Sequence, residues 1–210
     1  MNTRNSATNS TTALYDYLFD AGQRSLLYYD VMRQRGNQYL AHMAQTAPNV
    51  LQFTSHLVLD GRKLSPPVNY GIVKIIPPEG TITDEQKRPF VVIDPRAGHG
   101  PGIGGFKAES EIGEAMKAGH PCYFIGFTPH PEPKQTIEAV IEAWKVFLDR
   151  VIEMSTEAEG KPVVIGNCQA GWALMMLAAK YPELCGPIIL AGSPLSYWAG
   201  VRGVNPMRYS

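Results

Sequence analysis

The chain of 210 residues, with a mass of 23.1 kDa, is long enough for one globular domain with an ordinary hydrophobic core and a short extension. It contains 19 lysines and arginines and 19 aspartates and glutamates, so its net charge at pH 7 is zero. This balance argues against a nucleic-acid-binding protein and against a basic membrane-binding face. No stretch has the length and apolar character of a signal peptide or a transmembrane segment, so we expect a cytoplasmic protein.

The three cysteines are Cys122, Cys168 and Cys185. Their number is odd, and their spacing does not match the C-x-x-C pattern of structural metal sites. We therefore expect reduced thiols and no bound metal, as in most cytosolic proteins.

The N-terminal region is predicted to consist of a tail and a helix. Residues 1–12 are rich in serine, threonine and asparagine, so we expect a disordered tail. Residues 13–50 are predicted to be an amphipathic helical extension, with the helix running from Ala13 to about Ala47. Two interpretations of this helix remain. In the first it packs on its own domain, and in the second it binds a partner through tyrosines such as Tyr28 and Tyr29. Apolar side chains recur there every three or four residues over much of its length: Leu14, Leu18, Ala21, Tyr28, Met32, Tyr39 and Met43.

Residues 51–210 are predicted to form one α/β domain. It opens with an antiparallel lead-in, in which a strand from His56 to Leu59 enters a tight hairpin turn at Asp60-Gly61 and a second strand covers Val68 to Ile76. From Pro89 onward strands alternate with helices, which is typical of parallel βαβ units. The strands are expected at 90–94, 122–127, 163–165 and 188–191, and the helices at 107–118, 135–154 and 170–180.

The segment from Pro162 to Gly171 has the pattern of a nucleophile elbow. A β-branched strand ends at Gly166, a helix starts near Ala170, and Cys168 stands between them, as the nucleophile does in G-x-S-x-G. The positive end of the helix dipole favours a thiolate at this position. The backbone N–H of Gln169 would then face the oxyanion formed on an attacked carbonyl. The alternative interpretation is a buried structural cysteine in a strand-to-helix turn.

The glycine-rich loop after the first parallel strand supports two different functions. Gly100, Gly102 and Gly105 match the dinucleotide fingerprint G-x-G-x-x-G between a strand and a helix. The next strand, however, is not followed by the acidic residue that holds a ribose, and Pro101 lacks an N–H group. In the second interpretation, a backbone N–H near Ala97 or Gly98 completes the oxyanion hole.

With these features in place, the stretch from Phe90 to Trp198 resembles the catalytic domain of polyhydroxyalkanoate synthases, which are α/β-hydrolase-fold acyltransferases with a Gly-x-Cys-x-Gly-Gly elbow. This chain has Gly-Asn-Cys-Gln-Ala-Gly at 166–171 and a matching Ala-Gly-Ser-Pro-Leu at 191–195. The N-terminal helix and hairpin resemble an uncharacterised, synthase-related family of longer proteins. The resemblance implies that Cys168 accepts a hydroxyacyl group from a coenzyme A thioester, without a bound cofactor. Separately from this resemblance, the tyrosines and methionines of residues 13–47 suit contact with a polymer granule surface or with a partner protein.

One departure from this family concerns the catalytic triad. In the α/β-hydrolase fold the acid and the histidine follow the nucleophile in the chain, but here no histidine or aspartate follows Cys168, and Glu183 is the one downstream carboxylate side chain. A dyad of His99 with Cys168 is conceivable, because both lie at the C-terminal ends of predicted neighbouring strands. We therefore expect an N-terminal fragment of a longer protein, inactive by itself, whose fold lacks its C-terminal part. Three hypotheses follow: an acyltransferase, a non-catalytic acyl- or granule-surface-binding protein, and a dinucleotide-binding domain.

Overall fold

The computed structural model describes residues 5–45, 51–95, 107–196, 199–201 and 204. Contacts within the chain divide it into two units, residues 1–48 and 49–210. Each unit is described by itself below.

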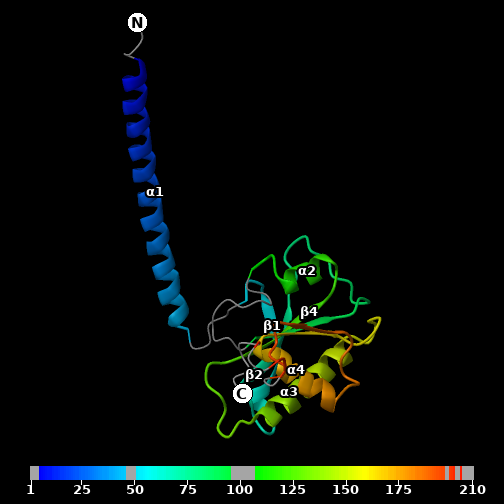
Figure 1. Cartoon of the computed structure of the whole chain (residues 1–210). Helices are drawn as coiled ribbons and strands as arrows, with labels where there is room; N and C mark the ends of the chain where they lie inside the picture. The colour runs from blue at the N-terminus through cyan, green and yellow to red at the C-terminus, as the bar shows by residue number, and fades with distance from the viewer. Residues whose placement is uncertain (1–4, 46–50, 96–106, 197–198, 202–203, 205–210) are drawn as a thin grey trace. The chain divides into compact units, whose positions relative to one another are not determined.

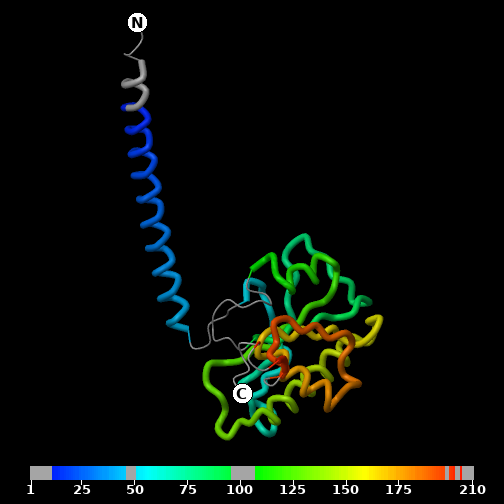
Figure 2. The backbone as a smooth tube through the Cα atoms, in the orientation of Figure 1, coloured from blue at the N-terminus to red at the C-terminus, as the bar shows by residue number. Residues whose placement is uncertain are grey.

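The first unit is a single long helix, α1 (Asn5–Met43), drawn as an unbroken coil in Figure 2. The polar pattern predicted a disordered tail as far as residue 12, and this is wrong from Asn5 onward. Serine, threonine and asparagine cost only about 0.5 kcal/mol each relative to alanine in a helix, and adding a residue to an existing helix is far easier than starting one. The helix ends at Met43, four residues before the predicted end.

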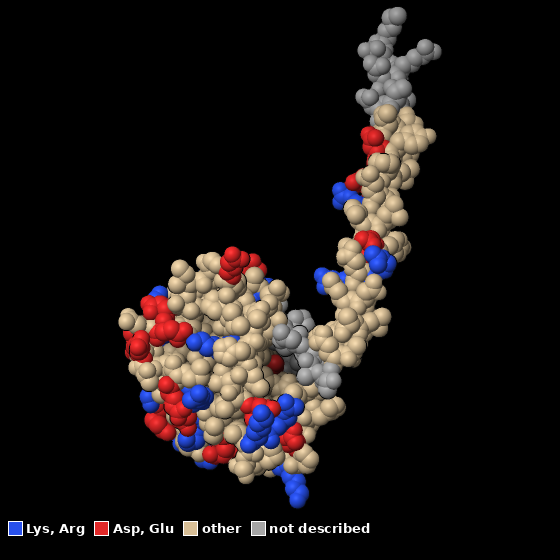
Figure 3. Space-filling model, turned by 180° about the vertical axis from the view of Figure 1, so that it is seen from behind, with Lys and Arg blue, Asp and Glu red and all other residues tan. Residues whose placement is uncertain are grey.

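Apolar side chains of α1 are exposed within this unit. Tyr15 is 72 % exposed and Leu26 is 74 % exposed. The charged side chains are few, and two pairs of them form local ion pairs, Arg24 with Asp20 and Arg33 with Asp30. Figure 3 therefore shows isolated red and blue patches on an otherwise uncharged helix. The large apolar residues that are exposed are Leu14, Tyr15, Tyr17, Leu18, Phe19, Leu26, Leu27, Tyr28, Tyr29, Val31, Met32, Tyr39, Leu40 and Met43.

The second unit is built on a six-stranded sheet with the order β1-β2-β4-β3-β5-β6. Strands β4, β3, β5 and β6 run parallel to one another, whereas β2 is antiparallel to both β4 and β1. The strands are β1 (Ser55–Asp60), β2 (Tyr70–Ile75), β3 (Phe90–Ile93), β4 (Cys122–Phe127), β5 (Val163–Asn167) and β6 (Ile188–Ala191). The helices are α2 (Glu111–Lys117), α3 (Ile137–Met154) and α4 (Gln169–Lys180).

The helices cover both faces of the sheet. In Figure 1, α2 lies on one side of the strands and α3 and α4 lie on the other. Successive side chains of a strand point to opposite faces, so Val91 and Ile93 pack with α3 and α4 while Val92 packs with α2. The parallel strands are therefore apolar without alternation, as the sequence predicted. Trp144 and Phe147 of α3 are fully buried in the larger of the two cores.

The antiparallel lead-in is present, but its connection differs from the prediction. Strands β1 and β2 pair antiparallel, and Asp60 pairs with Gly71. No two-residue turn joins them, because Asp60 instead caps a short 3-10 helix, η1 (Gly61–Lys63), by accepting a hydrogen bond from the Arg62 N–H. The Asp-Gly pair therefore begins a helical turn and not a hairpin turn.

The remaining boundaries follow from helix capping. Helix α2 starts at Glu111 instead of Lys107, because the Ser110 hydroxyl accepts a hydrogen bond from the Gly113 N–H and fixes the first turn. The Thr136 hydroxyl caps α3 in the same way. Strands β4 and β6 have the predicted bounds.

Candidate active site

The link between β5 and α4 is a single residue, Cys168. Its backbone has a φ of 49° and a ψ of −123°, which is a rare and strained conformation for a residue with a side chain. Two hydrogen bonds hold it: its N–H donates to the Ala191 carbonyl at 2.9 Å, and its own carbonyl accepts from the Gly171 N–H at 3.1 Å. The residue is partly buried at the start of α4. This is the geometry of a nucleophile elbow, with a cysteine at the position of the nucleophile.

The strained turn requires a close approach of strand to helix at two glycines. A Cβ atom on Gly166 would lie 2.9 Å from the Gly171 Cα, and one on Gly171 would lie 3.0 Å from the Gly166 oxygen. In the G-x-C-x-A pattern of residues 166–170, Ala170 stands where the nucleophile-elbow pattern has its second glycine, and Ala170 is fully buried. The closest contact, however, is at Gly171, one residue further along the helix.

Two side chains that sequence reasoning left without a role hold the elbow. The Ser193 hydroxyl, just after β6, donates to the Gly166 carbonyl at 3.2 Å. The Asn167 side chain, fully buried at the end of β5, donates to both carboxylate oxygens of Glu111 at 3.1 and 2.8 Å. No sequence signal could have found the second pair, because 56 residues separate its members.

The predicted oxyanion groups are only partly described. Gln169 is the first residue of α4, where a backbone N–H has no acceptor within the helix. The side chain of Gln169 has a separate contact, because its Oε1 accepts a hydrogen bond from the Trp172 indole N–H at 2.7 Å. Ala97, Gly98 and His99 lie outside the described residues. The same holds for the glycines at 100–105 on which the dinucleotide hypothesis depends.

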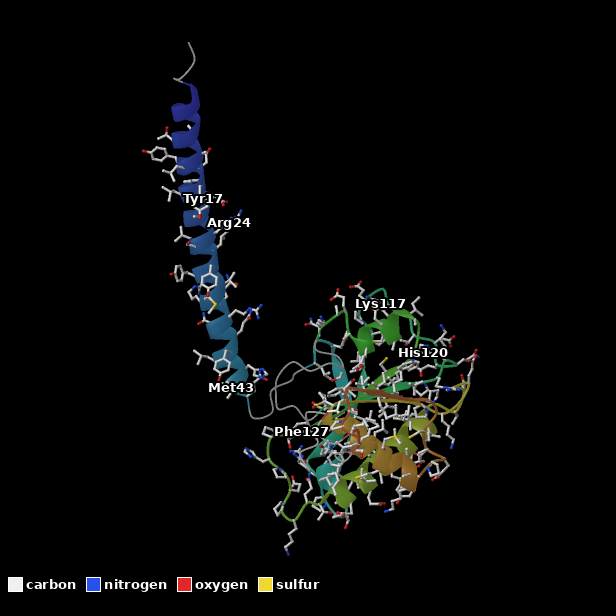
Figure 4. The ribbon with its side chains drawn as sticks, in the orientation of Figure 1. Tyr17, Arg24, Met43, Lys117, His120 and Phe127 are labelled. Carbon is white, nitrogen blue, oxygen red and sulfur yellow. The ribbon has the colours of Figure 1, made fainter. Side chains whose placement is uncertain are left out.

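Two other polar residues lie near the ends of the parallel strands. Asp94 is buried directly after β3, the neighbour of β5, and its N–H donates to the Ile125 carbonyl. His120 lies before β4, at the end of the sheet opposite Cys168, and Figure 4 labels it together with Phe127, the last residue of that strand. Its ring Nδ1 forms a hydrogen bond with the Arg88 carbonyl at 2.8 Å, and the ring packs at a tilt of 59° against Phe90, so His120 has a structural role.

The three thiols have different surroundings. Cys122 is buried at the start of β4, and burial raises its pKa to about 12. Burial, followed by the charge of Glu183, also raises the pKa of Cys185. Of the three, Cys168 is the one at a helix N-terminus and in a strained turn.

An apolar groove of about 440 Å³ runs along the outer side of α4. It begins at Trp172, one helical turn after Cys168, and continues past Met175, Met176 and Ala179. Leu195, in the segment after β6, forms its other wall. The groove offers apolar contacts to a flexible chain close to the elbow.

The strand order, the helix arrangement and the elbow define an α/β-hydrolase-like fold, which suits hydrolytic or acyl-transfer chemistry. Residues 20–210 match a family described as proteins of unknown function, DUF3141. The chain belongs to this family. Among the helices of the described residues, none is both long and apolar enough to cross a membrane.

A curated relative is an uncharacterised protein of Rhizobium meliloti, encoded in the ackA 5′ region. It is 66 % identical over 196 residues, which cover 93 % of this chain and 27 % of the relative. The chain thus spans about a quarter of the length of this relative.

Solved structures with a similar fold are more distant. A probable hydrolytic enzyme of Pseudomonas aeruginosa is 14 % identical with a TM-score of 0.49, over 70 % of this chain and 44 % of that one. A monoacylglycerol lipase of Paleococcus ferrophilus is 13 % identical with a TM-score of 0.40, over 61 % and 44 % of the two chains. At this distance the substrates of these proteins carry no information about this one.

Proposed function

We propose that the protein takes part in acyl transfer and that Cys168 accepts the acyl group of a coenzyme A thioester. The observation that carries the proposal is the cysteine in the strained turn between β5 and α4, where its thiol meets the positive end of a helix. The resemblance of the 166–171 segment to the elbow of polyhydroxyalkanoate synthases adds the acyl class, a hydroxyacyl group.

The step is balanced without a metal or a redox partner. The Cys168 thiolate attacks the thioester carbonyl, a new carbon–sulfur bond forms, and the Gln169 N–H stabilises the oxyanion. The carbon–sulfur bond to coenzyme A then breaks, and its thiolate leaves with the electron pair and takes a proton from water. One thioester replaces another, so the step is close to thermoneutral. The groove that starts at Trp172 supports the proposal because it offers an apolar path for the acyl chain.

The test is the formation of a covalent adduct. The whole protein, including any sequence that follows Ser210, is incubated with 3-hydroxybutyryl-coenzyme A, released thiol is measured, and peptide mass spectrometry locates the added acyl mass. We expect acylation at Cys168, none in Cys168→Ala, and normal acylation in the matched control Cys185→Ala. Adduct formation that persists in Cys168→Ala would refute the assignment.

A second candidate function is supported by a separate observation, the exposed apolar side chains of α1. Such a helix fits the surface of a polymer granule or of another protein. Binding to poly(3-hydroxybutyrate) particles would then persist in Cys168→Ala and disappear when residues 13–47 are removed. Replacing Tyr28 and Tyr29 by alanine should weaken binding, whereas the same change at the exposed polar Gln23 and Gln38 should not. Particle binding without residues 13–47 would exclude this role.

A further inference from the structure

The elbow is held from both faces of the sheet by different chemistry. Gly166 faces α4, where it packs against Gly171 and Leu174. The next residue, Asn167, faces the opposite side, where its amide meets Glu111 at the start of α2. Because Cys168 directly follows Asn167 in the chain, a movement of Asn167 would also displace the Cys168 thiol.

The Asn167 amide is incompletely satisfied as it stands. It is fully buried, and its Nδ2 donates to both oxygens of the Glu111 carboxylate. Its Oδ1 is buried as well and has no hydrogen-bond partner among the residues that the structure describes. A buried acceptor without a donor is costly, so such a group calls for an explanation.

We propose that Glu111 is a positioning residue for Cys168. In this proposal Glu111 is a neutral carboxylic acid, and it holds the Asn167 amide through two hydrogen bonds. In this arrangement a small rotation of the amide lets the Glu111 O–H donate to Oδ1 while Nδ2 still donates to the other carboxyl oxygen. Every polar atom of the pair is then satisfied, which an ionised carboxylate, having no donor, cannot achieve.

The surroundings of Glu111 favour the neutral form. The side chain is half-buried, and burial raises its pKa, while the hydrogen bond from Asn167 acts in the opposite direction. Its neighbours along the same segment do not replace this contact, because Glu114 is exposed and pairs with Lys117. Glu111 does not touch the substrate in this proposal. It acts on the thiol through Asn167.

The inference deepens the proposed function, since its purpose is a well-placed Cys168, but its test does not require acyl transfer. The rate of Cys168 alkylation by iodoacetamide is measured in the full chain by peptide mass spectrometry, with Cys185 as an internal reference. Glu111→Gln keeps both hydrogen bonds, because its amide has one donor and one acceptor for Asn167. Glu111→Ala removes both, and Glu111→Asp keeps the carboxyl but withdraws it by one methylene.

We expect alkylation of Cys168 to slow by about tenfold in Glu111→Ala and Glu111→Asp, because the strained turn then relaxes and the sulfur leaves the N-terminus of α4, where the helix dipole assists a nucleophile. Glu111→Gln should stay within about twofold of the natural chain, since both hydrogen bonds remain. Glu114→Ala, on the same helix, is the matched control and should change nothing. If Glu111→Ala does not fold, the comparison of Glu111→Asp with Glu111→Gln decides.

Equal rates in all variants, or an equal loss in Glu111→Gln and Glu111→Asp, would overturn the proposal. A chain that follows the expected alkylation pattern but forms no acyl adduct would refute the proposed function alone. The two conclusions can therefore fail separately.

Discussion

The contact between Gly171 and Ser193 allows the packing of the elbow to be tested by one added methyl group. In Gly171→Ala the new Cβ would overlap both the Oγ and the Cβ of Ser193 and would lie 3.0 Å from the Gly166 oxygen. Neither neighbour yields easily, because the Gly166 oxygen belongs to the backbone and the Ser193 Cβ is bonded directly to it. Ser193 must move and give up its hydrogen bond to the Gly166 carbonyl.

The expected magnitude follows from three terms. Overpacking costs about 1–3 kcal/mol, and the lost hydrogen bond costs about 1 kcal/mol. Replacing glycine by alanine within a helix returns about 1 kcal/mol. We therefore expect Gly171→Ala to lower the free energy of unfolding by about 1–3 kcal/mol, since the clash outweighs the gain in helix propensity.

The assay is urea unfolding monitored by tryptophan fluorescence. The unfolding midpoints of the variant and the natural chain are compared, provided that the dependence of the free energy on urea concentration is the same in both. Ser193→Gly should relieve most of the overlap, so the double variant should be less destabilised than the sum of the two single changes. Gly36→Ala in α1, where a Cβ meets nothing within 4 Å, is the control and should raise helicity. A Gly171→Ala chain as stable as the natural one would refute the reasoning.

Further predictions concern buried groups. Because burial raises the pKa of Cys122 to about 12, iodoacetamide should leave this thiol unmodified in the folded chain at pH 8 and label it once urea unfolds the protein. Because this pKa is higher in the folded than in the unfolded chain, the stability linked to Cys122 is fully present below the unfolded pKa and is lost as the pH rises toward 12. Unfolding curves measured from pH 8 to 11 should show this loss, and Cys122→Ala should abolish the pH dependence. Burial also raises the pKa of Glu111. Its contribution to the free energy of unfolding is therefore fully present below the ordinary pKa range of glutamate and declines as pH rises. Glu111→Gln should remove this pH dependence of stability. Trp144→Ala should cost about 3–5 kcal/mol, read from the urea midpoint, because the side chain is fully buried in the main core.

Local sequence patterns were sufficient for most of the fold. The strands of the second unit and the long helix α3 were predicted because a sheet buried on both faces leaves continuous apolar runs, and α3 an apolar stripe. Local signals failed where two structures compete for the same residues. Asp60-Gly61 suits a hairpin turn, yet the Asp60 carboxylate binds the Arg62 N–H and stabilises a 3-10 turn. The Ser- and Asn-rich segment from Asn5 joins α1 because an existing helix extends at little cost.

The site shows the same division between local and long-range information. The position of Cys168 was predictable, since a strand, a glycine and a helix in one short segment define the turn. What holds the turn was not predictable, because its contacts join residues far apart in the chain: Ser193 to Gly166, and Glu111 to Asn167. A residue with positive φ persists only where its surroundings fix it, so these contacts matter as much as the motif. A cysteine in a G-x-C-x-A pattern without these contacts would be free to relax, and its thiol would leave the N-terminus of α4.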